Sequence, residues 1–484
     1  MAVLGQALTR VACAALALSG QILAPSTAGA EDTACVTAGQ ALRYVVNFDR
    51  ATAASAATAE VSAACGETTI YYPQIAVGVA TSADPDFAQR FGTDRAFSAQ
   101  AERLAAQRAN GATTPKTPNL RPELRPTDPA TVPAPDRTAE QWDMRAINAE
   151  WARSINAGSR DVVVGVLDSG IDPAHPELTR ALAADLSSGC LTGAPDQDPK
   201  AWAATTSAHG THVAGIIAAA DDGKGISGVA PGVRLASVKV IDDRGYVDPE
   251  AAVCGLMWAA EQRMKVTNSS FVVDPWALSC AHGEDHGVVR EAMARAVEYS
   301  TEAGTLNVAA ATNEAVNLTP SPRADTLPTR KSAAVGCEAL PAGLRDVVAV
   351  SSVNVTRVKA GYSSYGLGVI DVTAPGGEVG NCVLSTVPGG YAPLCGTSMA
   401  APHVAGVLAL MASAHPDYPP RQLRKALDEE ATPIACPADY DLTGDGTQAA
   451  YCAGYDAYNG FYGHGMVDAL AAVAPRMPTL DPAG

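Results

Sequence analysis

From Trp142 onward, apolar runs of strand length alternate with helical stretches, and this alternation constrains the fold more than any other feature. Strands are predicted at five runs that are rich in apolar residues: 162–167, 234–240, 266–273, 305–310 and 347–351. Helices are predicted at 211–220, 249–263, 287–303 and 399–414. Strands without polar alternation are buried on both faces, so we predict an α/β fold with a mainly parallel central sheet and helices on both faces. In such folds the functional side chains gather at the carboxyl ends of the strands.

The sequence before this region has the pattern of a small separate module. It contains an apolar run, an alanine-rich helical stretch, two extended runs and further helical sequence, at 42–48, 52–64, 68–73, 75–80 and 84–108. Prolines then recur at positions 115, 118, 122, 126, 129, 133 and 135, which excludes a helix or a central strand there. We therefore predict a small α+β module joined to the larger domain by an exposed linker.

The N-terminus has the features of a secretory signal peptide. Arg10 precedes an apolar run from Val11 to about Leu23, and Ala-Gly-Ala at 28–30 has the small-x-small form of a signal-peptidase site. This run is too short to span a bilayer, and no later run is expected to reach the ~18 to 20 residues that a membrane helix needs. We predict cleavage after Ala30, a secreted and extracellular protein, and no membrane attachment after cleavage.

These boundaries divide the chain into five predicted segments: a signal peptide at 1–30, the α+β module at 31–110, the proline-rich linker at 111–138, the main domain at 139–476 and a C-terminal tail at 477–484. The formal net charge is −17, from 51 acidic and 34 basic residues. Such a surface repels phosphate backbones and anionic lipids. Nucleic acid is therefore not an expected partner.

Cleavage of the signal peptide would leave ten of the eleven cysteines, an even number that predicts disulfides in an exported chain. None of them forms a CxxC pair, which argues against a zinc ribbon or a thioredoxin-like site. Proximity in sequence suggests two pairings: Cys436 with Cys452, and Cys35 with Cys65. Three pairings stay open for four others: Cys190, Cys254, Cys280 and Cys337.

Three segments hold side chains suited to nucleophilic catalysis. Asp168 ends the first predicted strand of the main domain, where a carboxylate can accept a hydrogen bond from an imidazole N–H and orient the ring. His209 stands at a predicted helix start, where it can act as a general base near neutral pH. Ser398 follows Gly396 at another helix start, where free backbone N–H groups can stabilise an oxyanion. Each residue alone also has an ordinary structural explanation, such as a helix cap for Asp168.

The sequence around these residues resembles the three signature motifs of the subtilisin-like serine peptidases, in that family's order: VVVGVLDSGI, HGTHVAG and GTSMAAPHVAG. The resemblance covers roughly 142–473. It implies that Ser398 is the nucleophile, that His209 is the general base and then acid, and that Asp168 holds the imidazole tautomer. It also implies peptide or protein substrates and no cofactor for the chemistry. A metal pair of His209 and His212 is the competing interpretation, but no HExxH motif supports it.

The resemblance also assigns residues around the reacting bond. Asn313 matches the family's oxyanion donor, and Thr312 stands before it where the family has Gly, so the local loop is expected to differ. Ser270, Phe271 and Val272 match the substrate-pairing strand, usually Ser-x-Gly. The bulky Val272 is expected to reshape the pocket wall beside an extended peptide. The alternative is a core strand whose register differs by one residue.

One predicted disulfide braces the segment that enters Ser398. A hairpin centred on Pro388-Gly389 would place Cys382 and Cys395 directly opposite each other, within disulfide reach.

Structural calcium is a further family trait. Asp222 lies in a loop similar in length to the family's calcium loop, and Glu177 matches a position that usually supplies a carboxylate; hard oxygen ligands suit calcium. A glycine-rich turn with solvated acids explains these residues equally well.

Chain order and the linker predict a precursor, or zymogen. In this hypothesis the module from Glu31 to about Asn110 is an inhibitory propeptide that assists folding of a slow-folding parallel topology. The alternative is an accessory domain that persists in the mature enzyme. A different hypothesis for the whole chain is a catalytically inert subtilisin-like binding module, motivated by Thr312 and Val272.

Overall fold

The structure is a computed structural model that describes residues 35–36, 39–109, 128–129, 135–280, 284–320, 332–378 and 380–474. The chain divides into two compact units, Met1–Cys35 and Val36–Gly484. The predicted signal peptide, most of the linker and the predicted C-terminal tail lie outside the described residues. All elements named below belong to the second unit.

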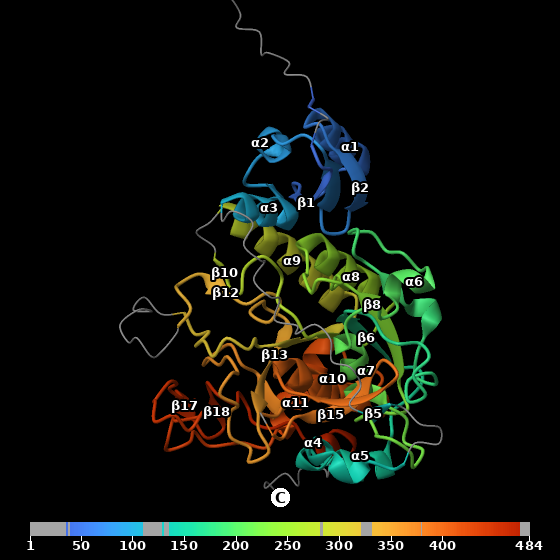
Figure 1. Cartoon of the computed structure of the whole chain (residues 1–484), viewed down its shortest axis with the longest axis vertical. Coiled ribbons are helices and arrows are strands. Elements are labelled where there is room, and N and C mark those ends of the chain that lie inside the picture. The colour runs from blue at the N-terminus through green and yellow to red at the C-terminus, as the bar shows by residue number, and fades with distance from the viewer. Residues whose placement is uncertain are drawn as a thin grey trace, which may run out of the picture. The chain divides into compact units, whose positions relative to one another are not determined.

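A parallel sheet forms the centre of this unit (Figure 1). Its strands are β6 (Val163–Asp168), β7 (Ser188–Gly189), β8 (Arg234–Lys239), β9 (Val266–Ser269), β11 (Leu306–Ala310), β13 (Val347–Val353) and β14 (Val372–Pro375). They form seven strands in the order β14-β13-β11-β9-β6-β8-β7, and every neighbouring pair is parallel. The predicted parallel sheet is confirmed.

Helices cover both faces of this sheet (Figure 1). One face packs against α7 (His209–Ala218) and α10 (Thr397–Ala414), and the other against α8 (Pro249–Glu261) and α9 (Glu284–Glu302). Strand β6 serves both cores: Val164 and Val166 lie in the first, and Val163 and Leu167 in the second. Because alternate side chains of a strand point to opposite faces, a continuously apolar strand fits this position between two helical layers.

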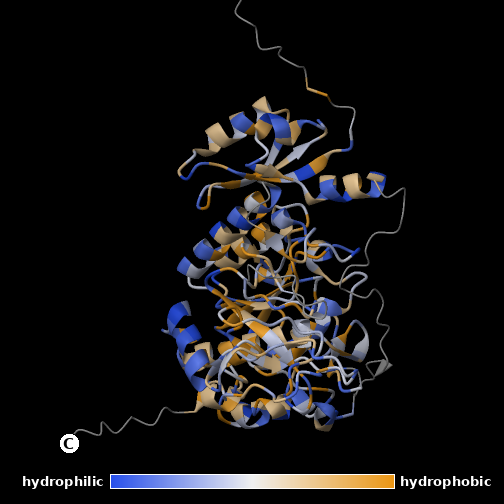
Figure 2. Cartoon of the chain, turned by 90° about the vertical axis from the view of Figure 1, so that its left-hand side faces the viewer, coloured by the Kyte–Doolittle hydropathy of each residue, from blue (hydrophilic) through white to orange (hydrophobic). Residues whose placement is uncertain are grey.

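Helix α10 corrects one expectation from the sequence. It is 18 residues long and apolar enough to cross a membrane, although no run after the signal peptide was expected to reach that length. The helix is 83% buried inside the protein, where it packs against the central strands. Figure 2 shows the hydrophobic residues gathered in this interior. The apolar length of α10 is therefore that of a core helix.

The N-terminal module forms a separate antiparallel sheet. Its elements are β1 (Leu42–Asn47), α1 (Ala54–Ala63), β2 (Glu67–Tyr72), β3 (Val77–Ser82), α2 (Phe87–Phe91), β4 (Ala96–Phe97) and α3 (Ala99–Ala109). The strand order is β2-β3-β1-β4, with antiparallel pairs throughout. The helix predicted at 84–108 is wrong as one element, because Gly92 ends α2 with a φ of 121° and β4 then pairs with β1.

A hairpin lies beside α7 and leads into α10. It consists of β15 (Val383–Val387) and β16 (Gly390–Leu394), and β5 (Asp128–Pro129) pairs with β16. Val387 pairs with Gly390, so Pro388 and Gly389 form the loop, as predicted.

The remaining elements are short or peripheral. They are two 3-10 turns (Thr138–Glu140 and Ala184–Leu186), α4 (Trp142–Ala146), α5 (Ala149–Ile155), α6 (Pro199–Trp202), β10 (Ser279–Cys280), β12 (Cys337–Glu338), α11 (Pro420–Glu430), β17 (Gly454–Tyr455), β18 (Tyr458–Asn459) and α12 (Ala469–Val473).

Four disulfides are described in this unit, and two of them were predicted. Cys382–Cys395 and Cys436–Cys452 are confirmed. The pairings that the sequence left open are Cys190–Cys254 and Cys280–Cys337. The pairing of Cys35 with Cys65 stays a prediction.

Candidate active site

Asp168 occupies the carboxyl end of β6, the strand between β8 and β9 at which the chain order of the sheet reverses direction. Open parallel sheets bind ligands at such a switch point. The Asp168 side chain is fully buried, and both carboxylate oxygens lie close to Nδ1 of His209, at 2.8 and 2.9 Å. The backbone N–H of Ser169 donates to the same carboxylate at 2.7 Å. The carboxylate is thus fixed in place and aimed at one ring nitrogen.

His209 is the first residue of α7 and is almost completely buried. An ionised carboxylate only accepts hydrogen bonds, so the contact with Asp168 assigns the proton to Nδ1. In the neutral ring, Nε2 then carries the lone pair. This arrangement leaves Nε2 able to accept a proton from a nucleophile.

His212 lies one turn further along α7 and has a different role. Its Nε2 lies 3.1 Å from the carbonyl oxygen of Val383 and 3.0 Å from that of Ala392, so Nε2 must donate. Burial, followed by the nearby His209, lowers the pKa of His212 to about 3, and the ring is neutral. Among the described residues, no histidine joins a group of three or more candidate metal ligands. The geometry therefore favours a structural His212 over a metal pair with His209.

Ser398 is the second residue of α10, and Gly396 is the N-cap of this helix. Gly396 has φ 154° and ψ 163°, a conformation essentially restricted to glycine. The Ser398 hydroxyl donates to the carbonyl oxygen of Ser270 at 3.3 Å. The hydrogen bonds of the described chain include none between Ser398 and His209. The expected catalytic contact is therefore absent in this conformation.

Pro402 explains a second contact between Ser398 and Ser270. In a regular helix the N–H of residue 402 would donate to the Ser398 carbonyl, but proline has no N–H. The Ser270 hydroxyl donates to that carbonyl at 2.9 Å instead. Ser398 is thus linked to Ser270, directly after β9, by two reciprocal hydrogen bonds.

Asn313 follows β11 and is oriented by the turn before Ser398. Its Oδ1 accepts hydrogen bonds from both the backbone N–H and the hydroxyl of Thr397, at 2.9 and 2.8 Å. This fixes the amide orientation and leaves the Nδ2 hydrogens as donors on the other side. The Nδ2 atom lies 3.4 Å from the place where a side chain on Gly396 would begin.

Thr312 keeps the backbone conformation that glycine normally supplies. Its φ is 81°, which is rare for a β-branched residue and stores strain. Two contacts with Ser364 hold it there: a hydroxyl–hydroxyl hydrogen bond of 2.7 Å and a bond of 3.1 Å from the Ser364 N–H to the Thr312 carbonyl. Thr312 thus adopts a positive φ that glycine would adopt without strain, and the expected difference of this loop from the family pattern stays a prediction.

The segment 270–272 leaves the sheet earlier than predicted. β9 ends at Ser269 and not at Val273, because the N–H of Val273 donates to the carbonyl of Leu340 at 3.1 Å. Phe271 packs into the core shared with α8 and α9. Val272 packs against a small apolar cluster that includes Ala311, next to Thr312. Of the three residues, Ser270 thus contacts Ser398, and Val272 lies near the segment that leads to Asn313.

Glu177 and Asp222 lie in two different environments. Glu177 is buried and accepts a hydrogen bond of 2.6 Å from the Tyr391 hydroxyl. Burial raises its pKa to about 7, and the charge of Asp222 adds to this shift. Asp222 is exposed, with Lys224 Nζ 3.9 Å away. Two carboxylates from separate segments that repel each other suit a divalent cation. Each already has another partner, the Tyr391 hydroxyl for Glu177 and the Lys224 ammonium for Asp222.

Some residues that support the site gave no recognisable signal in the sequence. His403 in α10 and Asp143 in α4 are fully buried, with Nε2 and Oδ2 3.0 Å apart, and the other ring nitrogen of His403 donates to the Met399 carbonyl at 2.8 Å. His403 belongs to the third motif, but nothing around Asp143 indicated a partner. Thr397 also belongs to that motif, and its role became visible only with Asn313 beside it.

Comparisons with known proteins identify a family and relatives of this chain. Residues 159–465 match the model of the Subtilase family. The chain is 32% identical to fervidolysin of Fervidobacterium pennivorans over 70% of this chain and 44% of that protein. It is 36% identical to subtilisin NAT of Bacillus subtilis subsp. natto over 56% of this chain and 61% of that protein. The chain thus spans less than two thirds of the length of both relatives.

A solved structure shows the same fold. The epidermin leader peptide processing serine protease EpiP of Staphylococcus aureus superimposes with a TM-score of 0.61 at 19% identity, over 90% of this chain and 98% of that chain.

Proposed function

The chain belongs to the subtilase family, and on that premise we propose that it is a serine-type endopeptidase with Asp168, His209 and Ser398 as its catalytic residues. The observation that carries the proposal is the contact of both Asp168 carboxylate oxygens with Nδ1 of His209 at the carboxyl end of β6. It leaves Nε2 of His209 as the proton acceptor that a serine nucleophile requires.

The proposed reaction begins with a rotation of the Ser398 side chain from Ser270 towards His209. The hydroxyl oxygen attacks the carbonyl carbon of the substrate, and its proton moves to Nε2 of His209. His209 then gives this proton to the leaving amine, and an acyl ester on Ser398 remains. Water, deprotonated by His209, hydrolyses the ester and restores Ser398. Asp168 stabilises the imidazolium in both halves of the reaction.

Two donors would stabilise the oxyanion of the tetrahedral intermediate. One is Nδ2 of Asn313, whose orientation Thr397 fixes through Oδ1. The other is the backbone N–H of Ser398, which stands in the first turn of α10 and has no carbonyl one turn earlier in the helix. Donors held in place before the reaction cost no reorganisation when charge develops.

Peptide or protein substrates would bind as an extended strand along 270–272. Main-chain groups of this segment are available for such pairing because β9 ends at Ser269. Val272 and Thr312 would line the adjoining pocket, with Ser270 next to the nucleophile. Phe271 would support the segment from the core and would not contact the substrate.

The N-terminal module is proposed to act as a propeptide of a secreted precursor. The module contacts α8 and α9 of the main domain. Nε of Arg43 lies 3.1 Å from Oε1 of Glu250, and Nδ2 of Asn47 donates to the Val288 carbonyl at 2.9 Å. The Arg295 guanidinium donates to carbonyl oxygens of the module, among them that of Phe48 at 2.9 Å. A preformed surface against these two helices would help a parallel sheet to fold. The disulfides support an oxidising, extracellular location.

Structural calcium is proposed at Glu177 and Asp222, without any part in the reaction. A bound cation would relieve the repulsion that contributes to the raised pKa of Glu177.

A fluorophosphonate probe, which reacts with activated serines, tests the central proposal. We expect the secreted protein to be labelled and the Ser398→Ala variant not to be. Absence of labelling in the wild type would favour the inert binding module. The same variant tests the propeptide: Ser398→Ala protein should retain residues 31–110, whereas the wild type should lose them by cleavage between about 111 and 141. A fully active wild type that keeps the module would contradict this assignment.

A further inference from the structure

We propose that the Cys382–Cys395 disulfide is a positioning bridge for Ser398, so that the chain is fully active only while this disulfide is oxidised. The inference rests on the function proposed above and adds a redox requirement to it. It comes from the way this bridge connects the two helices that present the proposed base and nucleophile.

The bridge closes the base of the hairpin directly before the nucleophile. Val383 and Leu394 form the last paired positions of β15 and β16, and the two cysteines follow immediately outside them, with their Cα atoms 4.7 Å apart. Only Gly396 and Thr397 separate Cys395 from Ser398. A displacement of Cys395 is therefore transmitted to Ser398 over a very short length of chain.

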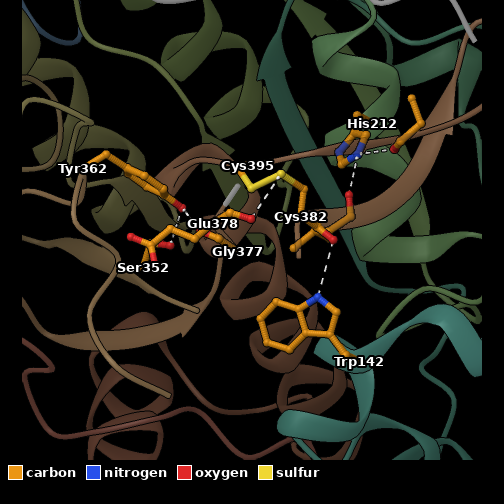
Figure 3. The surroundings of a disulfide bond; sticks show 10 residues. Trp142, His212, Ser352, Tyr362, Gly377, Glu378, Cys382 and Cys395 are labelled. Atoms are coloured by element: carbon orange, nitrogen blue, oxygen red, sulfur yellow. Dashed lines mark hydrogen bonds between the residues drawn. A yellow bond between two sulfur atoms is a disulfide. The ribbon is translucent and has the colours of Figure 1, made fainter. Parts of the chain in front are cut away.

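The hairpin is also fixed to α7, which begins at His209. The Ser385 hydroxyl donates to the His212 carbonyl and the Thr386 hydroxyl to the Thr211 carbonyl, both at 2.7 Å. Nε2 of His212 donates to carbonyl oxygens of both strands (Figure 3). These hydrogen bonds fix the hairpin to α7. The disulfide in addition joins the residue after β16, Cys395, to the residue before β15, Cys382.

On its other side, the disulfide packs against the segment that follows β14. A side chain on Gly377 would begin 3.2 Å from Sγ of Cys395, so the backbone approaches the sulfur closely. The Tyr362 hydroxyl donates to the Gly377 carbonyl at 2.6 Å, and the Trp142 indole N–H to the Cys382 carbonyl at 3.4 Å (Figure 3). Trp142 thus holds Cys382, Tyr362 holds the segment at Gly377, and the Gly396 N–H next to Cys395 donates to the Gly376 carbonyl at 3.0 Å. The S–S bond adds a covalent link between Cys382 and Cys395 to these hydrogen bonds.

Reduction would remove this restraint without unfolding the hairpin. Both cysteines are only half-buried, so a thiol reductant can reach them. A thiolate of the reductant attacks one Sγ, the S–S bond breaks, and a mixed disulfide forms; a second thiol of the reductant resolves it. Cys382 and Cys395 then carry two thiols, and the reductant has become a disulfide. Misplacement of a reacting group by about 1 Å can cost ~10²-fold in rate.

The chain offers a matched control for the test. Cys436–Cys452 closes a loop of similar length, with a sequence separation of 16 against 13 for Cys382–Cys395. The two bridges should therefore contribute similarly to stability, because the chain-entropy term depends on loop length. Two double variants of the full chain, C382S/C395S and C436S/C452S, would be compared in kcat and KM on a peptide substrate, in fluorophosphonate labelling rate, and in urea unfolding on a Ser398→Ala background.

We expect C382S/C395S to lose at least ~10-fold in kcat and in labelling rate, with a smaller change in KM, as for a misplaced nucleophile. C436S/C452S should keep kcat within about twofold, despite a similar loss of stability. Equal kcat losses in both variants, or an unchanged kcat in C382S/C395S, would overturn the inference.

A second measurement, on wild-type protein, tests the inference even if a double variant fails to fold. Folded wild-type protein would be titrated with a phosphine reductant, alkylated and mapped by mass spectrometry. Activity should fall in proportion to the fraction of Cys382 and Cys395 found alkylated. It should return on reoxidation in a reduced portion of the sample that has not been alkylated. An active wild type whose activity survives alkylation of these two thiols overturns the inference alone. A wild type inactive in both assays overturns the proposed function and this inference with it.

Discussion

The hydroxyl of Ser270 should stabilise the fold because it replaces a helix hydrogen bond that Pro402 removes. It donates to the Ser398 carbonyl at 2.9 Å and accepts from the Asn268 amide at 2.9 Å, in a position that is only 2% exposed. Ser270→Ala leaves both partners without this oxygen. An unsatisfied buried polar group costs about 1–3 kcal/mol, so we expect a loss of that size in the free energy of unfolding.

A double-mutant cycle separates this explanation from a general packing effect. Pro402→Ala restores the N–H that can donate to the Ser398 carbonyl along the helix. Ser270→Ala should then cost about 1 kcal/mol less in the Pro402→Ala background than in the parent, because one of its two orphaned partners has a new donor. Urea unfolding on a Ser398→Ala background measures this, since that change keeps the backbone carbonyl and prevents self-digestion.

One outcome of the double-mutant cycle would contradict this explanation. If Ser270→Ala costs the same with proline and with alanine at position 402, the hydroxyl does not substitute for the missing N–H. The reciprocal contact between Ser270 and Ser398 would then be a consequence of packing and not its cause.

Three further predictions concern single residues. Asn313→Ala should lower kcat by ~10² to 10³ with little change in stability, and an unchanged kcat would show another oxyanion donor. Thr312→Val keeps the strained φ but loses the hydroxyl bond to Ser364, so in urea unfolding it should be less stable than Thr312→Gly by about 1–3 kcal/mol; equal stability would contradict the strain. Burial raises the pKa of Glu177 to about 7. Between about pH 4.5 and 7 the folded chain therefore holds a proton at Glu177 that the unfolded chain has released. The contribution of Glu177 to the free energy of unfolding consequently falls as the pH rises through this range. Glu177→Gln should flatten that decline and abolish any stabilisation by added calcium, and an unchanged pH profile and calcium response would refute both assignments.

The central sheet could be predicted because its signal is local. Val163 to Leu167 is apolar at almost every position, and the structure places alternate side chains in two different helical cores. The ends of strands were less certain, since they depend on distant partners. Val273 belongs to the same predicted strand as β9, but its N–H donates to the Leu340 carbonyl. Nothing in residues 266–273 indicates that contact.

The disulfides also differ in whether their pairing depends on a local turn or on distant segments. The pairing of Cys382 with Cys395 follows from the turn residues between them, because a two-residue loop fixes which positions face each other. Cys280 and Cys337 also face each other across paired strands, β10 and β12. Their separation of 57 residues, however, is bridged by α9 and β11, so their register cannot be read from a turn.

The candidate site was predictable where a side chain lies in a recognisable motif, and unpredictable where its conformation depends on a residue outside the motifs. Gly396, Thr397 and Ser398 stand together in the sequence, and the first two set the helix start and hold Asn313. Thr312 depends instead on Ser364, which is 52 residues away and lies in none of the motifs. Sequence alone therefore presents Thr312 as a departure that puts activity in doubt. The structure gives a compensating pair of contacts, and a residue in an unfavourable conformation persists only where such contacts hold it. The doubt about Thr312 consequently becomes a question of stability at that residue, separate from the question of whether Ser398 reacts.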